Sequence, residues 1–138
     1  MNLILLGMPG AGKGTQAEYI QKDFGLANIS TGAMMREVSR SESELASRVQ
    51  SFLSSGTLVP NEIIVEMLVE RIQQDDCSNG FLLDGFPRNL EQGKALDNAN
   101  ISIDLVLYLS IEEEEIISRM SGRRVHLASG RSYHIEHN

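Results

Sequence analysis

The chain alternates short, unbroken apolar runs with longer segments in which apolar residues recur every three or four positions. The runs at residues 3–6, 81–83 and 105–109 have the length and continuous hydrophobicity typical of buried parallel strands, and 27–29 predicts a shorter strand. Strands that alternate with helices predict a parallel α/β sheet. Helices are expected from the glycine-rich loop to Gly25, from Thr31 through Val38, from Ser41 to Gly56, from Pro60 through Ile72, over 89–99 and over 111–120.

Residues at the expected helix ends support these boundaries. Thr31 is expected to cap its helix, and Ser41 with Glu44 has the spacing of a capping box. Pro60 suits the first turn of a helix, where its missing N–H has no cost. The acidic residues 112–115 suit the first turn of the last helix because they interact favourably with its dipole.

Composition is that of an ordinary globular protein and excludes several classes of partner. The 138 residues suffice for one domain with a hydrophobic core, and the net charge of −7 argues against general nucleic-acid binding. Cys77 lies in a polar turn and is expected to be a surface thiol. Because we find no signal peptide and no apolar stretch of about 20 residues, a cytoplasmic location without a membrane partner is expected.

A glycine-rich segment, Gly-Met-Pro-Gly-Ala-Gly-Lys-Gly-Thr at residues 7–15, follows the first apolar run directly. Its glycines let the backbone turn N–H groups towards an anion, and Lys13 and the following helix N-terminus add positive charge. The spacing fits a phosphate loop, except that Gly14 stands where Ser or Thr is expected. Thr15 is therefore the expected hydroxyl near Mg²⁺. The alternative interpretation is a tight strand-to-helix turn with an exposed lysine.

Asp84 and Arg88 are further candidates for phosphate chemistry. Asp84 ends an apolar strand, at the sheet edge where ligands bind in open α/β folds, and a carboxylate there can hold Mg²⁺ through water. Alternatively, Asp84 caps a turn. Arg88 follows the tight segment Gly-Phe-Pro at 85–87, and its guanidinium suits bidentate phosphate binding.

Three other arginines are ambiguous from the sequence. Arg119 and Arg123 are four residues apart and share one face if the last helix continues that far. Arg36 lies five residues after Thr31. Each is either a phosphate ligand or a solvated residue, and Arg119 and Arg123 can alternatively pair with Glu115.

Three histidines, His126, His134 and His137, lie in the last stretch of the chain. Clustered histidines are compatible with a metal site, but their spacing is irregular and no cysteine accompanies them. A zinc site is therefore not expected, and hydrogen bonding within a polar flap is the favoured role.

Taken together, these motifs resemble the adenylate kinase family. The loop at 7–15 matches that family's version, including Gly14 before Thr15. The segment Asp-Gly-Phe-Pro-Arg at 84–88 with this loop variant is specific to nucleoside monophosphate kinases. The resemblance continues through residues 30–36, 56–60, 92, 122–125 and 129–134, and so spans the whole chain in order.

The resemblance implies a phosphate-loop NTPase-type α/β/α fold of three layers with a parallel sheet and a helical insert that binds the nucleoside monophosphate. It implies a core at 1–29 and 60–121, the monophosphate-binding subdomain at 30–59 and the start of a lid at 122–138. The implied reaction is MgATP + AMP ⇌ 2 ADP, with Mg²⁺ as cofactor. Such a transfer needs positioning and charge stabilisation more than a nucleophile.

The resemblance also implies a role for individual positions. Asp84 would hold Mg²⁺ through water, with Thr15 as a further ligand, and Gln92 has the donor and acceptor needed to read an adenine edge. The catalytic residues would be Lys13, Arg88 and Arg123. The ATP contacts would be Gly10, Ala11, Gly12, Lys13, Gly14, Thr15, Arg119, Arg123, Ser132 and Tyr133. The AMP contacts would be Thr31, Arg36, Thr57, Leu58, Val59, Gly85, Phe86, Pro87, Arg88 and Gln92.

The chain departs from the family pattern at four positions. Ala33 stands where Asp is usual and Asn89 where Thr is common, and both changes should be tolerated. His126 and Ser129 stand where zinc-bearing relatives have cysteines, which implies a metal-free lid.

Family members run well beyond 138 residues, so this chain is expected to stop inside the lid and to lack the C-terminal strand and helices. Such a fragment would bind phosphates weakly and have little activity. Full-length members are expected to be monomeric, whereas an unpaired strand edge near 105–109 predicts self-association here. The alternatives are a UMP- or CMP-type kinase and a non-catalytic nucleotide-binding fragment; the segment at 84–88 disfavours a GTPase or ATPase switch.

Overall fold

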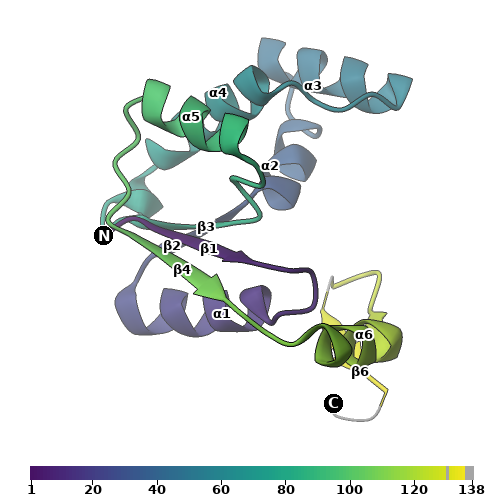
Figure 1. Cartoon of the computed structure of the whole chain (residues 1–138). Coiled ribbons are helices and arrows are strands. Elements are labelled where there is room, and N and C mark those ends of the chain that lie inside the picture. Colours follow the sequence, from purple (N-terminus) through teal and green to yellow (C-terminus); the bar gives the residue numbers. More distant parts are fainter. Residues whose placement is uncertain (130, 136–138) are drawn as a thin grey trace.

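The computed structural model describes residues 1–129 and 131–135, with only the backbone of Ser132 (Figure 1). The strands are β1 (Leu3–Gly7), β2 (Ala27–Ser30), β3 (Phe81–Asp84), β4 (Leu105–Leu109), β5 (Arg123–Val125) and β6 (Ser132–His134). The helices are α1 (Lys13–Phe24), α2 (Thr31–Val38), α3 (Glu44–Ser55), α4 (Asn61–Ile72), the 3₁₀ helix η1 (Asp75–Cys77), α5 (Leu90–Asn98) and α6 (Glu113–Gly122).

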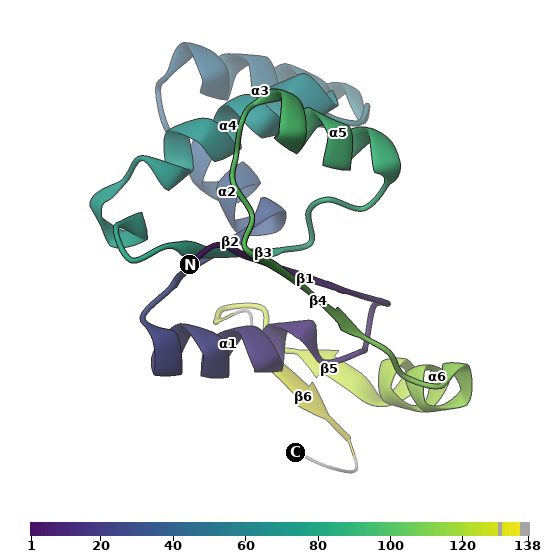
Figure 2. The ribbon, with the colours of Figure 1, turned by 60° about the vertical axis from the view of Figure 1, so that its left-hand side comes forward.

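Four strands form a parallel sheet in the order β2-β3-β1-β4, and β5 and β6 form a separate antiparallel pair. Helix α1 covers one face of the large sheet, and α2 to α5 lie on the other side (Figure 2). The three-layer α/β arrangement predicted from the sequence is therefore confirmed. Asp84 lies between Ser30 of β2 and Leu5 of β1 in the register, so the chain leaves all three strands at the same sheet edge.

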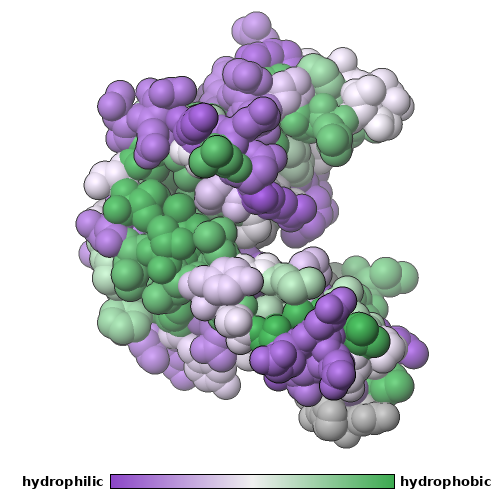
Figure 3. All heavy atoms as spheres, in the orientation of Figure 1, coloured by the Kyte–Doolittle hydropathy of each residue, from purple (hydrophilic) through white to green (hydrophobic). Residues whose placement is uncertain are grey.

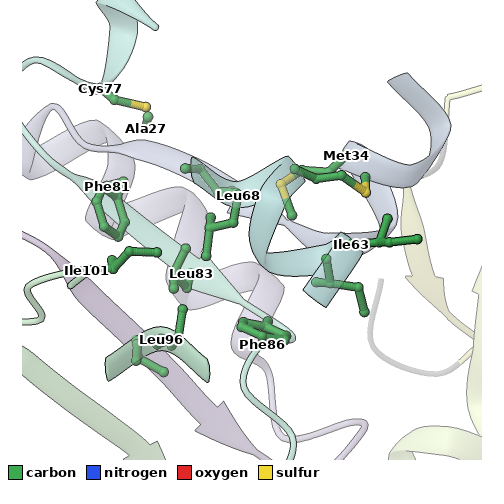
Figure 4. Close-up of a cluster of buried hydrophobic side chains, with 14 of the residues drawn as sticks. Ala27, Met34, Ile63, Leu68, Cys77, Phe81, Leu83, Phe86, Leu96 and Ile101 are labelled. Atoms are coloured by element: carbon green, nitrogen blue, oxygen red, sulfur yellow. The ribbon is translucent and has the colours of Figure 1, made fainter. Parts of the chain in front are cut away.

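The larger hydrophobic core lies between the sheet and helices α2, α4 and α5 (Figure 4). Phe81 and Leu83 of β3 meet Leu68 of α4 and Leu96 of α5 in this cluster. A smaller cluster on the opposite face packs Ala17 of α1 against the sheet. The two clusters fix β3 and β1, and so fix the loops that follow them. No helix within the described residues has the length and apolar character needed to cross a bilayer.

Strand β4 is the last strand of the sheet and is half exposed on both faces. The exposed fractions are 49% for Leu105, 50% for Val106 and 66% for Tyr108. The opposite edge strand, β2, buries both Ala27 and Ile29. A continuous apolar run normally marks a strand that is covered on both faces, so β4 departs from the pattern that its own sequence predicts.

Two predicted helix caps are wrong by one or two residues. Ser30, and not Thr31, caps α2, because its side chain accepts a hydrogen bond from Ala33 N at 3.1 Å. Ser43 caps α3 by accepting from Ala46 N at 3.0 Å. Ser41 instead donates to Val38 O, so the predicted capping box is not formed.

Cys77 is buried, which corrects the expectation of a surface thiol. Arg71 at the end of α4 donates to both carboxylate oxygens of Asp76, at 2.7 and 2.6 Å, and to Cys77 Sγ at 3.1 Å. These hydrogen bonds hold η1 against α4 and leave the thiol buried. Burial raises the pKa of the Cys77 thiol, so it stays protonated at neutral pH.

We expect the Arg71–Asp76 pair to stabilise the fold at neutral pH but not in strong acid. The hydrogen bond from Arg71 lowers the pKa of Asp76 below its ordinary value of 3.8. Because the folded pKa is the lower one, the stabilisation is present above about pH 4 and is lost as the pH falls through the folded pKa. Asp76→Asn should lower stability at pH 7 by less than about 1 kcal/mol, since the carboxylate is largely solvent-exposed.

Chemical unfolding of the parent chain and of Asp76→Asn across the acid range measures this difference. The two free energies of unfolding should converge as the pH falls. Asp75→Asn is the matched control, because it removes a neighbouring carboxylate that Arg71 does not bind. A difference for Asp76→Asn that stays constant into strong acid would contradict the assignment.

Candidate active site

The glycine-rich loop joins β1 to α1 and curves tightly between them. Gly10 and Gly12 have φ of +86° and +93°, a left-handed region that side-chain-bearing residues rarely adopt. Ala11 N donates to Met8 O at 3.1 Å and closes the turn. Gly12 is the N-cap of α1 and supplies no capping side chain to the N–H groups of the first turn. Such a helix start is suited to bind an anion.

Lys13 is held inside the curve of this loop. Its ammonium donates to Gly7 O at 2.9 Å and to Met8 O at 3.1 Å. A lysine ammonium has three donors, so these two bonds leave one N–H for an incoming ligand. The two carbonyls therefore fix a half-buried positive charge beside the N-terminus of α1.

Helix α6 brings a second cation to the same loop. The Arg119 guanidinium lies 3.9 Å from the point that a Cβ on Gly12 would occupy, and Met120 packs in the same way against Gly10. Glu115 accepts a hydrogen bond from Arg119 Nε at 2.8 Å. This pair is exposed and adds little stability, but it orients Arg119. The predicted pairing of Arg119 with Glu115 is therefore confirmed, and its role as a phosphate ligand stays a prediction.

Asp84 and Thr15 are the two predicted oxygen ligands for Mg²⁺. Asp84 ends β3 and is aligned with Leu5, two residues before the loop begins. Thr15 lies in the first turn of α1 and is exposed. A carboxylate and a hydroxyl are hard oxygen ligands, which fit Mg²⁺ held largely through water and phosphate. Within the described residues there is no cluster of three or more metal-ligating side chains.

A second group of polar side chains surrounds Gly85, at the end of β3. Gly85 has φ of +86°, and a Cβ there would lie 3.3 Å from Arg88 Nη2 and 3.5 Å from Thr31 Oγ1. Arg88 Nε donates to Gly85 O at 2.8 Å. The Arg36 guanidinium lies over Gly32, 3.3 Å from the position of a Cβ. The structure thus brings together Thr31 and Arg88, which are 57 positions apart in the sequence, with Arg36 one turn beyond Thr31.

Gln92 belongs to a hydrogen-bonded network next to this group. Its Oε1 accepts from Arg88 N at 2.7 Å, and its Nε2 donates to Asn61 Oδ1 at 3.1 Å. Asn89 caps α5 by accepting from Gln92 N at 2.9 Å. Asn89, which stands where Thr is common in the family, therefore still provides a capping side chain. Asn61 was not predicted as a site residue; the only sequence signal is its place directly after Pro60 at a helix start.

The other predicted contacts around this group differ in exposure. Thr57 Oγ1 lies 2.8 Å from Ser55 Oγ, and Leu58 is 94% exposed. Val59 packs against the main core, and Phe86 is buried within it. The Phe86–Pro87 peptide bond is cis. Phe86 therefore anchors the loop after β3, while Leu58 presents its side chain to solvent.

The last part of the chain corrects one prediction. Helix α6 ends at Gly122, so Arg123 starts β5 and does not share a helix face with Arg119. Tyr133 lies on β6 and is exposed. His126 Nδ1 lies 2.8 Å from Ser129 Oγ, in agreement with a hydrogen-bonding role in a polar flap. Gly130 and His137 lie outside the described residues, as does the side chain of Ser132.

The loop group follows β1 and the Gly85 group follows β3, so both lie at the carboxyl-end edge of the sheet. In the orientation of Figure 1, Figure 3 shows a hollow between the upper helices and the part formed by α6 and the β5–β6 hairpin. A parallel sheet with a glycine-rich loop after β1, a lysine in that loop and charged side chains at the carboxyl ends of the strands defines a phosphate-loop nucleotide-binding protein.

Comparison with known families assigns the chain more closely. The sequence profile described as adenylate kinase matches residues 5–136, and the chain belongs to the adenylate kinase family. The family consists of phosphotransferases of the nucleoside monophosphate kinase type, which use nucleotides as substrates.

Proposed function

We propose that the chain binds ATP and AMP in the hollow and transfers a phosphoryl group between them, MgATP + AMP ⇌ 2 ADP. The observation that carries this proposal is the pair of cationic groups at one sheet edge. Lys13 and Arg119 lie at the glycine-rich loop, whereas Arg88 lies against Gly85 and Arg36 lies over Gly32, next to Thr31. Two phosphorylated ligands that meet between these groups would have their negative charges compensated from both sides.

On the loop side, the residues proposed to bind ATP are those of the glycine-rich loop and three cations. Lys13 would stabilise charge on the transferred group, and Arg119 and Arg123 would add positive charge from α6 and β5. Thr15 and Asp84 would hold Mg²⁺, which supplies charge neutralisation to the phosphates. The proposed ATP contacts are residues 10–15, Arg119, Arg123, Ser132 and Tyr133.

On the Gly85 side, the residues proposed to bind AMP surround the phosphate and the base. Arg88 and Arg36 suit the phosphate because guanidinium donates two parallel hydrogen bonds to its oxygens. Gln92 suits the base edge. The proposed AMP contacts are Thr31, Arg36, Thr57, Leu58, Val59, Gly85, Phe86, Pro87, Arg88 and Gln92, and the proposed monophosphate-binding subdomain is 30–59.

Calorimetric titration with AMP, CMP and UMP, with and without MgATP, tests the proposal. AMP should bind at least about tenfold more tightly than UMP, as expected when a site hydrogen-bonds one base and leaves polar atoms unpaired with another. A preference for UMP would overturn the choice of acceptor. Failure of every monophosphate to bind would overturn the site itself.

Binding without efficient turnover is the second candidate function, and one observation favours it. Strands β5 and β6 are only three residues each, and the side chains of β5 are exposed. A hairpin of this size covers little of the hollow, and phosphoryl transfer benefits from exclusion of water. We therefore expect turnover well below the usual kinase range, on the order of 1–100 s⁻¹. A coupled assay that reaches that range would contradict this expectation.

A further inference from the structure

Helix α6 rests on the glycine-rich loop through a methionine. Cγ and Sδ of Met120 each lie 3.1 Å from the point that a Cβ on Gly10 would occupy, and Ile116 Cγ2 lies 3.8 Å from the same point. Because Gly10 has no side chain, the thioether lies directly against the backbone of the loop. Ile116 is the only residue of α6 with a side chain that is buried. Helix α6 therefore depends on Met120 for much of its contact with the loop.

The contact of Met120 with the loop also places the neighbouring Arg119. Nη1 of Arg119 lies 3.9 Å from the Cβ position of Gly12, two residues further along the loop than Gly10. Backbone hydrogen bonds keep a helix rigid over a single turn, so loss of the methionine contact would carry Arg119 away from the loop. The hydrogen bond to Glu115 does not oppose this movement, because both residues belong to α6.

Met120 remains exposed although it packs on the loop. Its exposed fraction is 43%, whereas Met34 and Met67 lie in the main core with exposed fractions of 5% and 2%. Peroxides oxidise the sulfur of accessible methionines to the sulfoxide, which is polar and disrupts apolar contacts. Met120 therefore combines an exposed side chain with a contact that depends on an apolar thioether.

We propose that Met120 is an oxidation site at which a peroxide releases α6 from the loop and so lowers the affinity of the chain for ATP. With hydrogen peroxide, the O–O bond breaks, one oxygen forms the S=O bond of the sulfoxide, and the other leaves as water with both protons. Sulfur loses the two electrons that the peroxide gains. Methionine sulfoxide reductases reverse the step with a dithiol, which becomes a disulfide while the oxygen leaves as water. The inference rests on the proposed ATP site and adds a modification that regulates it.

Met8 is a second exposed methionine in the same region, and its oxidation should matter less. Its side chain is 47% exposed. It supports the loop through its backbone, because its carbonyl accepts hydrogen bonds from Ala11 N and Lys13 Nζ. Oxidation of the thioether leaves this carbonyl in place. The effect of a peroxide on ATP binding should therefore depend on Met120 and not on Met8.

The test measures the dissociation constant of MgATP after treatment with hydrogen peroxide, for each chain relative to its own untreated sample. The treated parent chain should bind MgATP about three- to tenfold more weakly, because it loses a contact of the phosphates with a cation. Methionine sulfoxide reductases A and B with dithiothreitol should restore the affinity. Peptide mass spectrometry follows the sulfoxide at each methionine and the state of Cys77.

Two leucine variants assign the effect to one methionine. Met120→Leu has no sulfur and keeps an apolar side chain of similar volume, so peroxide should change its MgATP affinity by less than about twofold. Met8→Leu is the matched control, because it removes the other exposed thioether at the loop. Peroxide should weaken MgATP binding by Met8→Leu as much as it does for the parent chain.

Met120→Gln tests the same contact without an oxidant. Glutamine has a similar length and a polar end, as the sulfoxide does, so this chain should bind MgATP about three- to tenfold more weakly than the untreated parent. An unchanged far-ultraviolet circular dichroism spectrum would show that the variant is folded.

The possible failures are distinct. If the untreated parent chain does not bind MgATP, the proposed ATP site is wrong and the inference falls with it. If it binds MgATP and keeps its affinity when Met120 is fully oxidised, only the inference is wrong. Resistance of Met120 to peroxide, or an equal loss of affinity in treated Met120→Leu, would also overturn the inference.

Discussion

Replacing Lys13 with methionine should weaken ATP binding by about ten- to a hundredfold, because charge-assisted hydrogen bonds contribute about 1.5–3 kcal/mol. Any phosphoryl transfer should fall further, by about a hundred- to a thousandfold, since charge stabilisation in the transition state is lost as well. Methionine has a similar length and an apolar end, so the change removes the ammonium and little else. Calorimetry with MgATP and a radiolabelled transfer assay measure the two effects.

Because two loop carbonyls hold Lys13, the effect of Lys13→Met can be assigned to the glycine-rich loop. The bonds to Gly7 O and Met8 O place the ammonium inside the loop without help from any acidic side chain. AMP affinity should stay within about twofold of the parent, because Lys13 bonds to the glycine-rich loop whereas the proposed AMP site is built around Gly85. Lys22→Met is the matched control, since it removes the same charge from the last turn of the same helix. ATP binding by Lys13→Met within twofold of the parent would contradict the assignment.

The parts of the fold that depend on local chemistry could be predicted from the sequence. The apolar runs located β1, β3 and β4 to within a residue, and Gly25 ends α1 in the left-handed conformation expected of a helix C-cap. The phosphate loop was predictable because its glycines, its lysine and the flanking strand and helix are contiguous. Contiguous motifs need no knowledge of tertiary structure.

Other features depend on contacts between distant segments and could not be predicted. Ser30 and Thr31 are both good caps, and the pairing of Ser30 with Asp84 in the sheet decides which one remains extended. Cys77 is buried because Arg71 folds η1 onto α4. Arg123 leaves the helix because it pairs with His134 in the β5–β6 hairpin, a contact with a later segment of the chain.

The same reasoning applies to Asn61 and β4. Asn61 accepts a hydrogen bond from Gln92 only because α5 lies beside the start of α4. The run at 105–109 predicts a covered strand, yet its place at the end of the order β2-β3-β1-β4 leaves it half exposed. The apolar run predicts that a strand forms at 105–109. The position of this strand in the sheet depends on how the other strands pair.

We expect this β4 edge to pair with β4 of a second copy of the chain. Natural edge strands are usually protected by lysines, prolines or bulges, and β4 contains no charged residue or proline. A groove of about 340 Å³ continues from the strand towards α1 and is lined by the apolar side chains Leu5, Ile20 and Leu107. Pairing of the two β4 strands would cover the rim of this groove and would also cover Val106 and Tyr108.

The charges next to the strand favour an antiparallel pair. Centred on Leu107, an antiparallel pair sets Asp104 opposite Ser110 of the second copy, whereas a parallel pair in register sets Asp104 opposite itself. Like charges directly opposite each other destabilise a sheet. Because the net charge is −7, the two copies also repel each other at long range, so association should strengthen as salt is added.

Tyr108→Lys should therefore convert the associated form to a monomer in size-exclusion chromatography with light scattering. Tyr108 is 66% exposed, so the substitution adds a charge to the edge with little loss of packing. Tyr19→Lys is the matched control, because Tyr19 is 61% exposed and belongs to α1 and not to the edge strand. The control should associate like the parent chain. A parent chain that remains monomeric at high concentration and high salt would contradict pairing through β4, and equal dissociation by both variants would show a general effect of charge.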